Sequence, residues 1–146
     1  MIDRRSVARS FFESIGARDI EGAMKLVAPE ATVRLVPLGV TGSLAADGRR
    51  YFEALAAAFP DLRLRIRSLF VATDGTAVVE VTVEGTQAGE FLGIINQEKH
   101  MDLDQAWLLH VADDGLVDAA TGYWCQAMLY RRLAVKRLDR VTITAA

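Results

Sequence analysis

The amino-acid sequence predicts an α+β fold: a conical barrel of curved, mainly antiparallel sheet packed on three N-terminal helices. Two observations predict this class. Apolar residues recur at helical spacing through much of the first 60 residues, and from residue 62 they alternate with polar residues, as in strands with one wet face. Because no repeat, linker or low-complexity stretch divides residues 1–146, we expect a single domain.

Two short helices are expected first. Residues 4–18 place four apolar side chains on one face, and Asp3 before them is a suitable N-cap. Asp19 repeats this signal ahead of a second apolar stripe. Since Pro29 has no backbone N–H and disfavours helical geometry just before it, the second helix is expected to end near Ala28.

A short strand and a third helix are expected next. Residues 31–36 are typical of a strand, and the Pro-Leu-Gly sequence at 37–39 is typical of a turn. The third helix is expected to begin at Ser43 or Asp47 and to end at Pro60. Its apolar face consists of Tyr51, Leu55 and Phe59.

The C-terminal half predicts four strands. Tight turns are indicated by Asp-Gly at 74–75 and Asp-Asp-Gly at 113–115, and strict alternation of apolar and polar residues indicates one buried face. The strands are expected at residues 62–67, 79–84, 100–111 and 116–126. Helices followed by a run of antiparallel strands form a helical cover over a curved sheet, and such an interior commonly holds a small ligand.

Composition narrows the range of partners. The 17 Lys and Arg residues nearly balance 19 Asp and Glu, so no nucleic-acid partner is expected. The basic stretch 131–140 contains interleaved apolar residues, which favours a solvated element with one buried stripe over an anion site. The longest uncharged runs, 35–46 and 119–130, are shorter than the roughly 18 residues of a membrane span. With no apolar leader at the N-terminus, a cytoplasmic location is expected.

Cysteine and histidine are scarce. Cys125 is the single cysteine, which excludes an internal disulfide and a cysteine-clustered zinc site. His100 and His110 are the two histidines, so a histidine-rich metal centre is not expected either. We therefore expect no metal site.

Five segments occur in a recognisable order. They are residues 10–13, 16–21, 59–62, 85–94, and 114–117 followed by Tyr123-Trp124. Together they resemble the SnoaL-like polyketide cyclases of the nuclear-transport-factor-2-like superfamily, over residues 5 to about 134. The resemblance implies a homodimer with a deep pocket that holds an aromatic polyketide ester. It also implies a cofactor-free intramolecular aldol reaction, with a general base and hydrogen-bond donors for the enolate.

The positions that carry the cyclase chemistry differ in this sequence. The resemblance places a His-x-Asp pair of the cyclases on Ala120 and Gly122, neither of which can transfer a proton. It places a Gln-x-His pair on Gln105 and Trp107, so the glutamine is kept and the histidine becomes an indole. The chain is therefore expected to retain the pocket but to lack the usual base.

Strand periodicity then assigns side chains to faces. If Gln105 and Trp107 point inward, so do Ala120, Gly122 and Trp124 on the next strand. Small residues opposite two tryptophans suggest room for a flat ligand between aromatic walls, with the alternative that the indoles simply fill the core. Gln105 is expected either to hold a substrate carbonyl or to be a core residue satisfied by backbone.

Two further sets of candidate residues remain open. A register slip of one residue would bring Asp102, Asp104 and His110 into the pocket together as an acid/base set. Gln87 lies in the loop near the expected pocket mouth, at a position that is often histidine in the resembled family, and is a candidate ligand contact.

Three functional hypotheses follow. The first is a SnoaL-type enzyme acting on a flat, polyketide-like molecule, through a divergent cyclisation or a hydroxylation-associated step. The second is a non-catalytic ligand-binding or assembly protein on the same fold. The third is an epoxide-hydrolase-like enzyme, which would require Asp102 and Asp104 in the cavity with an arginine such as Arg34 between them.

Overall fold

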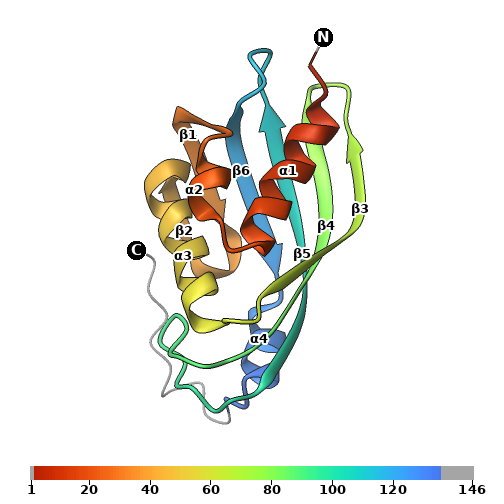
Figure 1. Ribbon diagram of the computed structural model, residues 1–146. Coiled ribbons are helices and arrows are strands. Elements are labelled where there is room, and N and C mark those ends of the chain that lie inside the picture. Colours follow the sequence, from red (N-terminus) through yellow and green to blue (C-terminus); the bar gives the residue numbers. More distant parts are fainter. Residues whose placement is uncertain (1, 136–146) are drawn as a thin grey trace.

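The computed structural model describes residues 2–135 and contains a curved, unclosed six-stranded sheet with α1, α2 and α3 on one side (Figure 1). The strand order is β2-β1-β6-β5-β4-β3, and β1 runs parallel to β6 while all other neighbours are antiparallel. The helices are α1 (Arg4–Gly16), α2 (Ile20–Met24), α3 (Arg49–Ala58) and α4 (Gln126–Arg132). The strands are β1 (Val27–Leu35), β2 (Val40–Ser43), β3 (Arg63–Val71), β4 (Thr76–Thr86), β5 (His100–Val111) and β6 (Val117–Trp124). The α+β class is confirmed.

The second helix is shorter than predicted, and the first strand is longer. Asp19 caps α2 as expected, but the helix ends at Met24 and β1 already begins at Val27. Pro29 therefore lies inside a strand. The pairing of β1 with β6 shifts register between Val27 and Thr32, and such an irregularity tolerates a residue without an N–H.

The third helix begins later than either predicted start. Ser43 caps a π-helical turn, η2 (Leu44–Gly48), by accepting from the Ala46 N–H at 3.3 Å, and α3 follows at Arg49. Asp47 turns back and accepts from the Ser43 N–H at 2.8 Å. Both residues therefore act as local caps. A 3₁₀ turn, η1 (Val36–Leu38), and the four-residue edge strand β2 precede them.

The chain after β6 forms a helix that the sequence analysis did not predict. The strand expected to reach residue 126 ends at Trp124, and α4 packs against β5. Leu129 within α4 and Leu133 just after it, four residues apart, are both buried. Of the basic stretch 131–140, Arg131 and Arg132 are exposed at the end of α4, and the part beyond residue 135 lies outside the described residues.

The register of the sheet agrees with the predicted alternation. Trp107 of β5 pairs with Val79 on one side and with Gly122 on the other, and all three lie on the buried inner face. Tyr123, beside Gly122, is 41% exposed on the outer face. The pairing of β5 with β6 keeps this register from Gln105 to His110 and shifts between His110 and Val111, beyond the aromatic positions.

A search for membrane spans found no helix among residues 2–135 with both the length and the apolar character to cross a bilayer.

Candidate functional site

The interior between α1, α3 and the sheet is an aromatic cluster centred on Trp107. Its indole is fully buried. The ring centroids of Phe12 and Phe52 lie 5.9 Å and 5.5 Å from it, and those of Tyr51 and Trp124 lie 6.3 Å and 6.4 Å away. These are ordinary distances for aromatic packing, so Trp107 is held on several sides by other rings.

The indole of Trp107 occupies the space beside Gly122. A Cβ atom added to Gly122 would lie 2.6 Å from Cη2 of Trp107 and 2.8 Å from its Cζ2 and Cζ3. The absence of a side chain at Gly122 therefore accommodates the tryptophan itself. At this point the small residue and the large one are in direct contact, and the indole is part of the core.

A chain of three buried polar groups crosses this interior. Trp107 Nε1 donates to Gln105 Oε1 at 2.9 Å, and Gln105 Nε2 donates to Tyr51 Oη at 3.0 Å. Because the indole N–H can only donate, it fixes which end of the Gln105 amide faces Tyr51. Gln105 is thus satisfied by side chains, an arrangement that neither interpretation of the sequence anticipated.

Of the three hydrogen-bonded residues, Tyr51 is the one that the sequence analysis did not identify as a candidate. It was expected only as part of the apolar face of the third helix. The one feature of the sequence that could have indicated a polar role is the hydroxyl group, at a position that leucine or phenylalanine could fill. Burial raises the pKa of the Tyr51 phenol well above its ordinary value, and the hydrogen bond from Gln105 offsets only part of that rise. The phenol is therefore neutral throughout the physiological pH range.

A cavity of about 210 Å³ adjoins the aromatic cluster on the side of α3. Its wall is largely apolar, and Asp47 and Arg50, which form a 3.3 Å ion pair, are its charged lining residues. The lining residues are Leu35, Leu38, Val40, Asp47, Arg50, Tyr51, Ala54 and Leu92. Tyr51 belongs both to this wall and to the buried polar chain.

The indole of Trp124 packs on the ring of Tyr51. The two rings stack with centroids 5.3 Å apart and an interplanar angle of 18°. Trp124 is half-buried, and its Nε1 donates to Gln126 Oε1 at 2.7 Å. This stack fixes the plane of the Tyr51 ring in the cavity wall.

Gln87 organises the loop between β4 and β5. Its Nε2 donates to the carbonyl oxygens of Gly89 and Ile94, at 3.0 Å and 3.1 Å, and the side chain is buried. It lines a second recess, of about 490 Å³, which is separate from the Tyr51 cavity. The structure thus places Gln87 in the support of the loop and away from the aromatic cluster.

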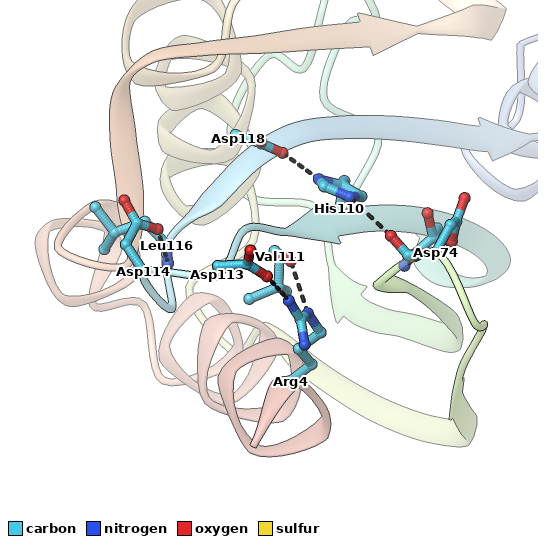
Figure 2. Close-up of polar contacts among 9 residues, drawn as sticks. Arg4, Asp74, His110, Val111, Asp113, Asp114, Leu116 and Asp118 are labelled. Atoms are coloured by element: carbon cyan, nitrogen blue, oxygen red, sulfur yellow. Dashed lines mark hydrogen bonds and ion pairs between the residues drawn. The ribbon is translucent and has the colours of Figure 1, made fainter. Parts of the chain in front are cut away.

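The candidates that required a register slip lie on the outer face. His110 Nδ1 contacts Asp118 Oδ1 at 2.6 Å, and its Nε2 contacts the backbone carbonyl oxygen of Asp74 at 3.0 Å, as Figure 2 shows. The carboxylate of Asp118 is the main cause that raises the pKa of His110 above its ordinary value, and the Asp74 carbonyl adds to it. His110 on β5 therefore links the turn between β3 and β4 to β6.

Asp104 belongs to another outer cluster. Its Oδ1 accepts from Thr82 Oγ1 at 2.8 Å, and the same hydroxyl oxygen accepts from Arg67 Nε at 2.8 Å. Asp102 and Arg34 are exposed on this side as well. The acid/base set and the Asp-Arg-Asp set both required inward-facing carboxylates, so the arrangement on which each depended is not present in the structure.

Apart from aromatic residues, the buried polar side chains among residues 2–135 are those of Thr82, Gln87 and Gln105, all uncharged. Within the same residues, no three His, Cys, Asp or Glu side chains converge in a way that could hold a metal ion. The polar groups at the aromatic cluster can therefore donate hydrogen bonds and stack, but those described there carry no carboxylate or imidazole to accept a proton.

Solved structures with the same fold come from several bacteria. AclR, a candidate hydroxylase from Streptomyces galilaeus, has a TM-score of 0.78 and 24% identity, covering 90% of this chain and 95% of its own. A SnoaL-like candidate polyketide cyclase from Jannaschia sp. CCS1 has a TM-score of 0.78 and 19% identity, covering 92% and 93%. IdmH, a candidate polyketide cyclase from Streptomyces antibioticus, has a TM-score of 0.73 and 18% identity, covering 91% and 99%.

A search of curated proteins found no significant match. The family model that describes the SnoaL-like domain matches residues 8–119, more than half of the chain.

Proposed function

Because the chain belongs to the SnoaL-like domain family, we propose that it binds a flat, apolar, polyketide-like small molecule in the Tyr51 cavity. The observation that carries the proposal is the composition of that cavity. Five aliphatic side chains and one tyrosine form most of its wall, and the ion pair of Asp47 and Arg50 adds a polar group. An apolar pocket with a few polar groups is the usual environment of a bound small molecule.

The size of the cavity indicates what enters it. An apolar cavity of about 150 Å³ is large enough to bind benzene, so 210 Å³ accommodates one aromatic ring with a short substituent. The rest of a larger polyketide-like molecule would extend past the rim towards Arg50, which is exposed. We therefore expect one ring of the ligand to be buried and the remainder to be partly solvated.

Ala54 provides the test, because it lines the cavity from α3. In Ala54→Phe the added ring fills part of the cavity, and we expect at least tenfold weaker binding of 1,8-dihydroxyanthraquinone by fluorescence titration. Ala57→Phe is the matched control, since Ala57 is exposed on the same helix and does not line the cavity. Equal affinity in the wild type and in Ala54→Phe would contradict the proposed site.

A non-catalytic binding role is the second candidate, and the residues at the family's acid/base positions favour it. Ala120 and Gly122 have no group that transfers a proton. Incubating the protein with a linear polyketide-like ester and analysing the recovered ligand separates the two roles. A cyclised or hydroxylated product indicates a SnoaL-type enzyme, whereas an unchanged ligand indicates a binding or assembly protein.

We also propose that the protein forms a homodimer through the outer face of the sheet. Phe70 on β3, Leu108 on β5 and Tyr123 on β6 are 55%, 37% and 41% exposed, and β4 lies between β3 and β5. Phe70 and Leu108 both pair with Val78, so they lie in one row across the sheet. Association of two copies would remove these apolar side chains from water.

A further inference from the structure

The buried polar chain leaves the hydrogen atom of the Tyr51 hydroxyl uncommitted. A hydroxyl group has one hydrogen to donate and two lone pairs that accept. Within residues 2–135, the one hydrogen bond at Tyr51 Oη is the bond that it accepts from Gln105. Gln105 cannot turn its amide to accept from Tyr51 without losing the bond from Trp107.

An uncommitted donor in this position is costly. Tyr51 is only 4% exposed, and a buried donor without a partner costs roughly 1–3 kcal/mol. Tyr51 also lines the 210 Å³ cavity, so a molecule bound there lies beside this side chain and can supply an acceptor. Since Oη already accepts a hydrogen bond, its own O–H is polarised and becomes a stronger donor.

The neighbours of Tyr51 fix the position of its ring and of its hydroxyl oxygen. Trp124 stacks on one face of its ring, and the centroid of Phe52 lies 5.2 Å away on the same helix. Trp107 and Gln105 hold the hydroxyl end through the hydrogen-bond chain. A ligand would thus meet a preorganised donor, which lowers the entropic cost of forming the bond.

We propose that Tyr51 is a ligand-binding residue that donates a hydrogen bond from its hydroxyl group to a carbonyl oxygen of the bound molecule. The ring of the ligand occupies the apolar part of the cavity, and its carbonyl oxygen faces Oη. This inference rests on the proposed function, because it requires the ligand to enter the Tyr51 cavity. It adds the chemical group by which the ligand is recognised.

Two probes of similar shape test the proposal. Acetophenone carries the carbonyl oxygen, and isopropylbenzene replaces it with a methyl group. We expect Tyr51→Phe to weaken acetophenone binding by about 2- to 12-fold and to leave isopropylbenzene binding unchanged. Tyr123→Phe makes the same change on the outer face and should bind both probes as the wild type does.

Infrared spectroscopy of carbonyl-labelled acetophenone gives a readout that a merely structural role would not change. The carbonyl band should shift to lower frequency in the wild-type complex and return to its apolar-solvent position in Tyr51→Phe. The wild-type spectrum alone tests the hydrogen bond if the variant fails to fold. An unshifted band, or a ratio of acetophenone to isopropylbenzene affinity that is the same in Tyr51→Phe as in the wild type, would overturn the inference, while binding of both probes would still support the cavity. Failure of the wild type to bind either probe would overturn the proposed function as well.

Discussion

Adding one methyl group at Gly122 tests how firmly the interior is packed. Contacting carbon atoms normally lie about 3.5–4.0 Å apart, whereas the new Cβ of Gly122→Ala would lie 2.6 Å from Trp107 Cη2. The indole or the strand must therefore move by about 1 Å. Phe12 and Phe52 pack against the indole, so it has little room to yield.

The expected cost follows from these contacts. Overpacking a well-filled core costs typically about 1–3 kcal/mol. A displacement of about 1 Å also disturbs the 2.9 Å bond from Trp107 Nε1 to Gln105 Oε1, and a lost hydrogen bond adds about 1 kcal/mol. We expect Gly122→Ala to lower the free energy of unfolding by about 2–4 kcal/mol and the Tm by roughly 5–15 °C.

Thermal and urea unfolding followed by circular dichroism measures this loss. Gly89→Ala is the matched control, because nothing lies within 4 Å of a Cβ added there and its φ is not positive. The control should unfold within about 0.5 kcal/mol of the wild type. If Gly122→Ala were as stable as Gly89→Ala, Trp107 would not be locked against β6, and the interpretation of the indole as core would be wrong.

Three other predictions concern the outer parts of the molecule. His110 has a raised pKa in the folded protein, so its pairing with Asp118 stabilises the fold fully below the unfolded pKa of 6.5, and this stabilisation is lost as pH rises through the folded pKa. His110→Gln should therefore flatten the fall in Tm above about pH 6.5, and the free energy of unfolding involved is less than about 1 kcal/mol because the pair is partly exposed. Thr82→Val removes the buried hydroxyl between Arg67 and Asp104 and should cost about 1–3 kcal/mol in urea unfolding, and a neutral result would mean that this bridge contributes nothing. Leu108→Arg should shift the protein from dimer to monomer in sedimentation equilibrium, and a dimer that persists in this variant would place the interface elsewhere.

The sequence was most informative where a local pattern decides the outcome. In β4 and β5, apolar and polar residues alternate over many positions, so only one register buries the apolar set. That alternation agrees with the buried position of Trp107 on the inner face. It was less informative at Pro29, where pairing with β6 outweighed the helical pattern that runs up to Val27.

The polar chain could not be predicted in the same way. Gln105 and Tyr51 are 54 positions apart in the sequence, and only the packing of α3 on the sheet brings them together. The contact between Trp107 and Gly122 likewise depends on packing that the sequence pattern does not specify. A small residue opposite a large one allows either a void or a filled core, and the rotamer of the indole, which strand periodicity does not specify, decides between them.

Trp107 and Gly122 are therefore best regarded as a coupled pair. A carboxylate at position 122, which the resemblance to the cyclases would place there, needs the volume that the indole now fills. The same indole supplies the N–H that orients Gln105 and, through it, Tyr51. The residue that excludes a base from this part of the interior thus also arranges a neutral donor. A donor of this kind stabilises negative charge on a carbonyl oxygen without removing a proton, and this is the chemistry that the proposed contact between Tyr51 and a ligand carbonyl requires.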